Sequence, residues 1–161
     1  MLGAITLADV AADWRDALLE LAPAPDQLRY AGTAAYSVSN AEADPSRRPV
    51  AILEDGRPVG LFVLQRGPVP GSIVVTAPDE LLLRGFFVDS AQQGRGIATA
   101  AVGLVRRFVR ANETGVRRVA LTVNLENEFA LLAYLRGGFT DTGEIDHTGR
   151  FGPQHVLELV F

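Results

Sequence analysis

The chain has 161 residues and a net charge of −4, from 15 basic and 19 acidic side chains, and it contains no cysteine. The absence of cysteine excludes disulfides, thiolate metal sites and cysteine nucleophiles. The mild acidity argues against nucleic acid as the main partner, because a phosphate backbone binds basic surfaces. The two histidines, His147 and His155, lack clustered partners, so we expect no metal.

Domain count and location follow from the distribution of apolar residues. Hydrophobic residues make up 48% of the chain, which is ordinary for a globular domain. No apolar run approaches the roughly 20 residues that span a bilayer. The N-terminal segment carries Asp9, Asp13 and Asp16, whereas a signal peptide is basic and then apolar. We therefore expect one domain over residues 1–161, in the cytoplasm, with no membrane or nucleic-acid partner.

The first part of the chain predicts one strand and two helices. Ala4–Leu7 is a short strand candidate, and a helix capped by Asp9 is expected over Ala11–Leu21. Gln27–Tyr30 is a candidate start for a second helix. The polar segment Ser37–Ser46 is expected to be a loop.

A β-hairpin is expected next. Two apolar runs, Pro49–Leu53 and Pro58–Leu64, flank the turn Glu54–Arg57, and the Asp-Gly pair in this turn is a strong hairpin signal. The segment Gly67–Glu80 is rich in proline and glycine and predicts mostly loop. Within it, Ser72–Val75 is a candidate strand extension.

The second half of the chain alternates strands and helices. Leu81–Val88 is nearly continuous apolar sequence, which is typical of a strand covered on both faces. A helix over Ile97–Asn112, a strand over Val116–Val123 and a helix over Asn127–Arg136 follow. This order predicts a parallel strand pair.

The end of the chain completes the predicted sheet. Gly137 and Gly138 stop the last helix, since glycine adopts the left-handed conformation of a helix cap. Phe139–Ile145 and His155–Phe161 read as two closing strands. The fold class is therefore α/β of the α+β type, with a mixed, mostly antiparallel sheet.

The loop between Val88 and the helix at Ile97 is the most informative segment. The first amides of a helix have no partners within the helix and lie at the positive end of its dipole, so they form an anion site. Gly94 and Gly96 let the backbone approach a bulky phosphate, and Arg95 can add a charge-assisted contact.

Three other interpretations of this loop are possible from its sequence. A P-loop needs a lysine, and this chain has none. A Rossmann dinucleotide loop needs a third small residue where Thr99 stands, and it would predict binding of NAD. The loop could also be a tight strand-to-helix turn without a ligand.

Two motifs together resemble the GNAT superfamily of acetyl-CoA-dependent N-acetyltransferases. Gln93-x-x-Gly96-x-Ala98 resembles the superfamily's pyrophosphate motif, Gln/Arg-x-x-Gly-x-Gly/Ala, with Ser90 standing where proline is common. Further on, the segment from Asn127 to Phe139 is similar to the second motif and reads Asn127-x-x-Ala130-x-x-Ala133-Tyr134-x-x-x-Gly138-Phe139. In the superfamily, leucine more often precedes this tyrosine.

The resemblance implies a single GNAT-like domain whose central parallel strands splay apart, with helices on both faces of the sheet. It also implies that acetyl-CoA lies between the splayed strands, and that Tyr134 is the general acid for the thiolate leaving group. The residues expected to bind the cofactor are Phe86, Phe87, Val88, Gln93, Gly94, Arg95, Gly96, Ile97, Ala98 and Asn127. The resemblance further suggests a homodimer.

The general base is not assigned by the motifs. Many family members carry an acidic residue on the first splayed strand, whereas here Arg84 stands in that region. Glu54, Asp79, Glu80 and Glu144 remain candidate bases.

The resemblance implies transfer of an acetyl group from acetyl-CoA to a primary amine of a small molecule or peptide, by direct attack in a ternary complex. Gln27–Tyr30, Phe86–Asp89 and Gly143–Asp146 resemble bacterial spermine/spermidine acetyltransferases, which makes a polyamine one candidate acceptor. Arg84 opposes a polyamine if it faces the acceptor. An aminoglycoside, a protein N-terminus and an amino acid derivative stay open. The alternative function is a non-catalytic acyl-CoA-binding sensor or scaffold.

Overall fold

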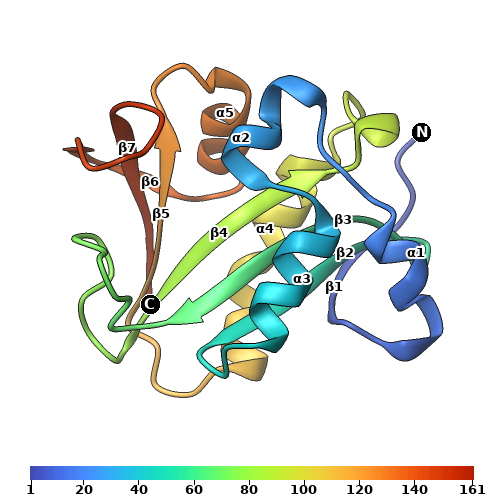
Figure 1. The fold of residues 1–161 in the computed structure, drawn as a ribbon, viewed down its shortest axis with the longest axis horizontal. Coiled ribbons are helices and arrows are strands. Elements are labelled where there is room, and N and C mark those ends of the chain that lie inside the picture. The colour runs from blue at the N-terminus through green and yellow to red at the C-terminus, as the bar shows by residue number, and fades with distance from the viewer.

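One seven-stranded sheet organises the computed structural model, which describes residues 1–161 (Figure 1). Its strand order is β1-β2-β3-β4-β5-β7-β6, and the pair β4–β5 is parallel while all other neighbours are antiparallel. The strands are β1 (Ile5–Asp9), β2 (Arg47–Glu54), β3 (Arg57–Arg66), β4 (Glu80–Val88), β5 (Arg118–Asn124), β6 (Thr140–Asp146) and β7 (Gln154–Val160). The predicted mixed, mostly antiparallel sheet with a central parallel pair is confirmed.

Helices cover both faces of this sheet, as expected. They are α1 (Arg15–Leu19), α2 (Leu28–Ala31), α3 (Ala34–Glu42), α4 (Ile97–Asn112) and α5 (Glu128–Arg136), with short 3₁₀ turns at Ala12–Trp14, Pro25–Gln27 and Ser90–Gln92. Figure 1 shows α3 in front of the sheet and α4 behind it. No helix combines the length and the apolar character that crossing a membrane requires.

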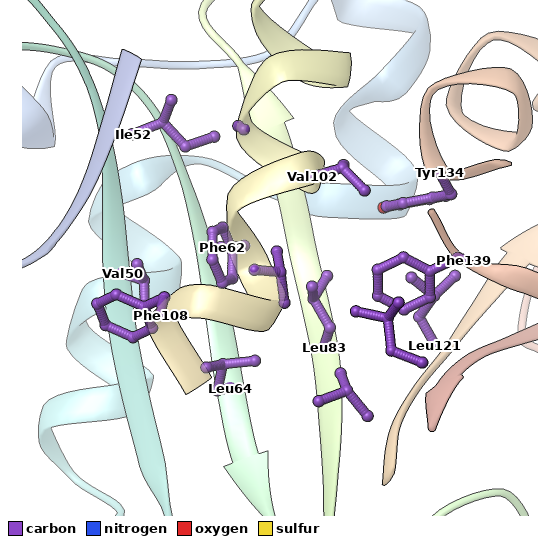
Figure 2. Close-up of a cluster of buried hydrophobic side chains, with 14 of the residues drawn as sticks. Val50, Ile52, Phe62, Leu64, Leu83, Val102, Phe108, Leu121, Tyr134 and Phe139 are labelled. Carbon is purple, nitrogen blue, oxygen red and sulfur yellow. The ribbon is translucent and has the colours of Figure 1, made fainter. Parts of the chain in front are cut away.

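Alternation along β2 explains how two helical layers share one sheet. Successive side chains of a strand point to opposite faces. Val50 and Ile52 pack in the cluster that contains the buried face of α4, whereas Ala51 and Leu53 pack in the cluster with α1 and α3. Each large apolar side chain that is buried in this way contributes about 1.5–3 kcal/mol. Figure 2 shows the first cluster, in which Phe62 and Phe108 fill the space between the sheet and α4.

The β2–β3 hairpin is confirmed at the predicted turn. Asp55 and Gly56 both have positive φ, 49° and 79°, which is the conformation of a type I′ turn. The predicted glycine stop of α5 is confirmed as well. Gly138 is left-handed at φ 111°, and the amide of Phe139 donates to the carbonyl of Tyr134.

Two expectations for the first part of the chain are wrong in extent. Most of the predicted loop Ser37–Ser46 is helical, because α3 begins after the cap Thr33 and buries small residues at helical spacing. Those residues are Ala34, Ser37, Val38 and Ala41. The first helix is shorter than Ala11–Leu21, since a 3₁₀ turn precedes the five residues of α1.

The candidate strand extension Ser72–Val75 is also wrong, since this segment forms no strand. The Ser72 hydroxyl accepts hydrogen bonds from the amides of Val74 and Val75 and so fixes a loop there.

The parallel strands β4 and β5 part after a short common stretch. They pair only from Glu80–Leu82 to Arg118–Ala120. Further along β4 there is a bulge, in which Phe62 of β3 faces both Gly85 and Phe86. Gly85 has φ 63°, a left-handed conformation that favours glycine. The predicted splay is therefore present, and the functional site lies where the two strands separate.

Candidate active site

Two cavities meet between the separated ends of β4 and β5. The first, about 370 Å³, is lined by the loop between β4 and α4, and we call it the loop cavity. The second, about 990 Å³, lies toward α2 and α3, and we call it the wide cavity. Both cavities are lined by Tyr30, Ala31, Phe86, Asn127, Ala130 and Tyr134. A reaction between two molecules, one in each cavity, would take place at these shared residues.

The loop before α4 presents free backbone donors to the loop cavity. Gly94 and Gly96 have φ of 80° and 86°, so the chain turns in a way that other residues resist. Gly96 is the N-cap of α4 and supplies no side-chain cap. The amides of Ile97, Ala98 and Thr99 have no acceptor within the protein. Free amides at the start of a 16-residue helix fit an anionic pyrophosphate.

The side chain of Gln93 anchors this loop to its surroundings. Its Nε2 donates to the carbonyl of Val88, 2.9 Å away, and to Oε1 of Gln27, 3.0 Å away. These bonds connect the loop to the end of β4 and to the turn before α2. Gln93 therefore positions the loop as well as lining the loop cavity.

Arg95 lies away from both cavities. Its Nη2 is 2.6 Å from Oε2 of Glu54, and its guanidinium also donates to Gln92 and to the carbonyl of Met1. The hydrogen bond from Arg95 holds the pKa of the Glu54 carboxyl below its usual range. The expected contact of Arg95 with the cofactor therefore stays a prediction. This contact would require the ion pair between Arg95 and Glu54 to open.

The other residues expected to bind the cofactor gather as a group. Nine of the ten line the loop cavity, and Arg95 is the exception. The nine are Phe86, Phe87, Val88, Gln93, Gly94, Gly96, Ile97, Ala98 and Asn127.

Tyr134 lies at the junction of the two cavities. The residue is 7% exposed, and its ring packs edge to face on Phe86 and on Phe139. Figure 2 shows Tyr134 beside Phe139. The hydroxyl forms no hydrogen bond within the protein, and burial raises its pKa above the usual value of 10.0. Tyr134 is therefore protonated near neutral pH and able to donate its proton to a group in the cavity.

Asn127 has a structural role that the motif did not suggest. Its side-chain oxygen accepts a hydrogen bond from the amide of Ala130 and so caps α5. An asparagine directly before an apolar helical run is a recognised N-cap signal, from which this role could have been found. The capping bond uses only the oxygen, so the amide group of Asn127 is available to the cavities that it lines.

The four candidate bases lie outside both cavities. Glu54 pairs with Arg95, Asp79 pairs with Arg117, and Glu80 is buried against Arg118. Glu144 lies exposed on β6. None of them is placed to take a proton directly from a molecule in the wide cavity.

Arg84, in contrast, lines the wide cavity. Sequence reasoning missed its partner Gln65, whose Oε1 accepts a hydrogen bond from Arg84 Nη1 at 2.7 Å. The available signal was Gln65 itself, the first polar residue after the apolar run Leu61–Leu64, because a buried amide needs partners.

Comparison with known proteins agrees with this geometry. The model of the acetyltransferase (GNAT) family matches residues 9–139. The chain belongs to the GNAT acetyltransferase family. The expectation of an N-acetyltransferase is confirmed by this membership.

Individual members of the GNAT family resemble the chain over most of its length. The uncharacterised N-acetyltransferase YbbJ of Bacillus subtilis (strain 168) is 30% identical over 132 residues, which is 82% of each protein. The spermine/spermidine N(1)-acetyltransferase of the same strain is 26% identical over 146 residues, covering 90% of this chain and 93% of the relative.

A solved structure supports the fold. The aminoglycoside acetyltransferase AAC(6')-Ib, in complex with coenzyme A and kanamycin, superposes with a TM-score of 0.75 at 21% identity. The match covers 98% of this chain and 95% of that protein. At this identity the likeness shows the GNAT fold.

Proposed function

We propose that the protein transfers an acetyl group from acetyl-CoA to a primary amine of a small molecule or peptide, within a ternary complex. One observation carries this proposal. The strands β4 and β5 part beside free helix amides, and Tyr134 lines both cavities that open there. Acetyl-CoA in the loop cavity and an amine in the wide cavity would then meet at Tyr134.

The residues of the loop cavity suit acetyl-CoA in charge and shape. The free amides of Ile97, Ala98 and Thr99 bind the pyrophosphate at the positive end of α4. The edge of β4 at Phe86–Val88 that faces β5 has no strand beside it, because pairing stops at Leu82. This edge has backbone groups for the amide-containing arm of the cofactor.

The transfer balances without any further co-reactant. The neutral amine nitrogen attacks the thioester carbonyl carbon, a C–N bond forms, and the C–S bond breaks. Tyr134 donates a proton to the departing sulfur, the nitrogen loses a proton to solvent, and solvent returns a proton to Tyr134. An unperturbed alkyl amine has a pKa of about 10.4, so only about one molecule in 10³ is neutral at pH 7. Any effect of the site that lowers this pKa therefore raises the rate.

The proposal is tested by the release of the CoA thiol from acetyl-CoA, measured across a panel of amines. The panel contains polyamines, an aminoglycoside, amino acids and short peptides with free N-termini. We expect turnover with one class of amine and a product that is N-acetylated in mass spectrometry. Tight binding of acetyl-CoA without turnover of any class would favour the non-catalytic acyl-CoA sensor.

A further inference from the structure

The charge of the wide cavity differs from that of the whole protein. The chain is acidic, with a net charge of −4, yet four arginines and only two acidic residues line this cavity. The arginines are Arg29, Arg47, Arg84 and Arg150, and the acidic residues are Asp44 and Asp146. A local excess of positive charge disfavours a polycation and favours a molecule with an anionic group.

Both aspartates of the cavity already have partners. Asp146 is 7% exposed, and its Oδ1 accepts hydrogen bonds from the amide and hydroxyl of Thr148. The Oδ1 of Asp44 accepts from the amide and hydroxyl of Ser46, and its Oδ2 lies 3.4 Å from Nε of Arg47. Asp44 is thereby paired with a cation, whereas Oδ2 of Asp146 has no hydrogen-bond partner and leaves one carboxylate oxygen for an ammonium group.

Arg84 is held in place by a chain of hydrogen bonds. Its Nη1 donates to Oε1 of Gln65, Nε2 of Gln65 donates to Ser46 Oγ at 3.4 Å, and Ser46 Oγ donates to Asp44 at 2.7 Å. Gln65 is 3% exposed, so its amide is enclosed by protein and is a firm support. Arg84 forms no ion pair and no other hydrogen bond, and four of its five N–H donors remain available.

Arg47 adds a second positive charge near Arg84. Its Nε is buried and has no hydrogen-bond partner. Partial burial, together with the charge of Arg47, lowers the pKa of the Arg84 guanidinium from its usual value, while the residue as a whole stays exposed on β4. Two neighbouring guanidinium groups that share only Asp44 repel each other, and an anion bound between them relieves that repulsion.

We propose that the acceptor carries a carboxylate close to its reacting amine and that Arg84, assisted by Arg47, binds this carboxylate. The inference rests on the proposed acetyl transfer and names the substrate class of the same site. A guanidinium matches a carboxylate with two parallel hydrogen bonds, which makes it a specific partner for this group. A simple diamine or polyamine lacks the group that Arg84 is arranged to bind.

The position of Arg84 on β4 limits the size of the acceptor. Arg84 precedes Phe86 by two residues, across the bulge at Gly85, and both residues line the wide cavity. The Phe86 ring in turn contacts Tyr134, with centroids 5.7 Å apart. The carboxylate and the amine therefore belong to one compact molecule, such as an amino acid.

The same arginines also assist the chemistry. A positive charge near an ammonium group disfavours its charged form and lowers its pKa. The arginines of the cavity wall thereby increase the fraction of neutral amine. Arg84 would thus bind the acceptor and also favour the protonation state that reacts.

The test compares two amines that differ by one carboxylate, ornithine and putrescine. Binding to the CoA-saturated protein is measured by calorimetry, and kcat/KM by CoA release. We expect ornithine to bind at least tenfold tighter and to react with a higher kcat/KM. Arg84→Gln should abolish this preference, mainly through KM for ornithine, by about 10- to 100-fold, which is the range for a lost charge-assisted pair. For putrescine KM should not rise, and any loss should be in kcat, because the variant also removes a charge that favours the neutral amine.

A control variant and the possible outcomes distinguish failure of this inference from failure of the proposed function. Arg107→Gln removes an exposed arginine of α4 outside both cavities and should change neither substrate. If putrescine binds as tightly as ornithine, or if neither binds, the inference is overturned. Phosphoethanolamine and ethanolamine form a second pair, and a preference for phosphate alone would overturn the choice of carboxylate. Turnover of polyamines alone would support the proposed acetyl transfer and contradict the inference that the acceptor carries a carboxylate.

Discussion

Phe86 of β4 and Tyr134 of α5 pack edge to face, with ring centroids 5.7 Å apart and planes at 68°. Phe86 belongs to the bulge that turns β4 away from β5, and Phe62 stacks on its other side with centroids 5.8 Å apart. The bulge that opens the site thus also supports the ring of the proposed proton donor. The arrangement couples the geometry of the cleft to the position of one hydroxyl group.

Tyr134→Phe should lower kcat by about 10²- to 10⁴-fold, the usual contribution of a positioned general acid. The affinity for acetyl-CoA and the free energy of unfolding should change little, because the hydroxyl forms no hydrogen bond within the protein. Steady-state CoA release and calorimetric binding of acetyl-CoA measure the two effects separately. An unchanged kcat would mean that water or another group protonates the sulfur.

The pH dependence of the wild-type rate provides a second check on Tyr134. Burial raises the pKa of its hydroxyl above 10.0, so the protonated form persists through pH 10. Deprotonation of Tyr134 should therefore not lower kcat below pH 10. The pH profiles of the wild type and of Tyr134→Phe should have the same shape up to this pH. A descending limb near pH 8 that is specific to the wild type would contradict the assignment.

Gly96→Asp should weaken binding of acetyl-CoA by more than about tenfold. The new side chain adds a negative charge at the proposed pyrophosphate site and must adopt φ near 86°, which costs roughly 1–2 kcal/mol for a residue with a Cβ. Gly103→Asp is a matched control, since Gly103 is an exposed position of α4 with open space around it. Equal affinities for acetyl-CoA in the two variants would show that the loop does not bind the cofactor.

Glu80→Gln should destabilise the protein by about 1–3 kcal/mol at pH 7, the usual range for a lost charge-assisted hydrogen bond. Glu80 is 4% exposed and accepts from the amides of Thr76 and Ala77 and from Arg118 Nη1 at 2.8 Å. Burial alone would raise the pKa of the Glu80 carboxyl, but these hydrogen bonds outweigh it and the pKa lies below 4.5.

The sign of the pH effect at Glu80 follows from this lowered pKa. The stabilisation is fully present above pH 4.5, where the carboxyl is ionised even in the unfolded chain, and it is lost as the pH falls through the lower folded value. Urea unfolding at pH 7 and at pH 3.5 measures it. The difference in unfolding free energy between wild type and Glu80→Gln should shrink at the lower pH, and a constant difference would contradict the role of the charge.

Gly137→Ala should destabilise the protein by about 1–3 kcal/mol through overpacking. A Cβ at this position would lie 2.3 Å from Cγ1 of Val102, on the buried face of α4. In the double variant with Val102→Ala, the loss should be smaller than the sum of the two single losses, because the second substitution removes the clashing atoms. Urea unfolding of the four proteins gives this coupling, and strict additivity would show that the contact is not the cause.

Much of the molecule from the β2–β3 hairpin onward was predictable from local sequence. Residues close in sequence specify three of its elements. These are the apolar run Leu81–Val88, the helical period of Ile97–Asn112 and the Asp-Gly turn at Asp55. Gly94 and Gly96 directly before a helix likewise predict a phosphate-binding loop, because the free amides of a helix start are a local property. The strand, the helix and the turn agree with the structure, in which the amides of Ile97, Ala98 and Thr99 have no acceptor.

Helix α3 shows where local reasoning failed. Its sequence is polar and rich in small residues, so its apolar face is weak and it was expected to be part of a loop. It is helical because Ala34, Val38 and Ala41 pack against the second face of the sheet, and tertiary burial outweighs low intrinsic preference.

The chain's own pattern determined most of the elements, the motifs and the family, because each of these depends on residues that are close in sequence. Only the tertiary structure decided which side chains face the reaction. It placed Arg95 against Glu54, removed four candidate bases from the cavities, and joined Arg84 to Gln65 across neighbouring strands. Side-chain partners that are 19 to 41 residues apart depend on sheet register and on the bulge at Gly85, and no local period encodes these.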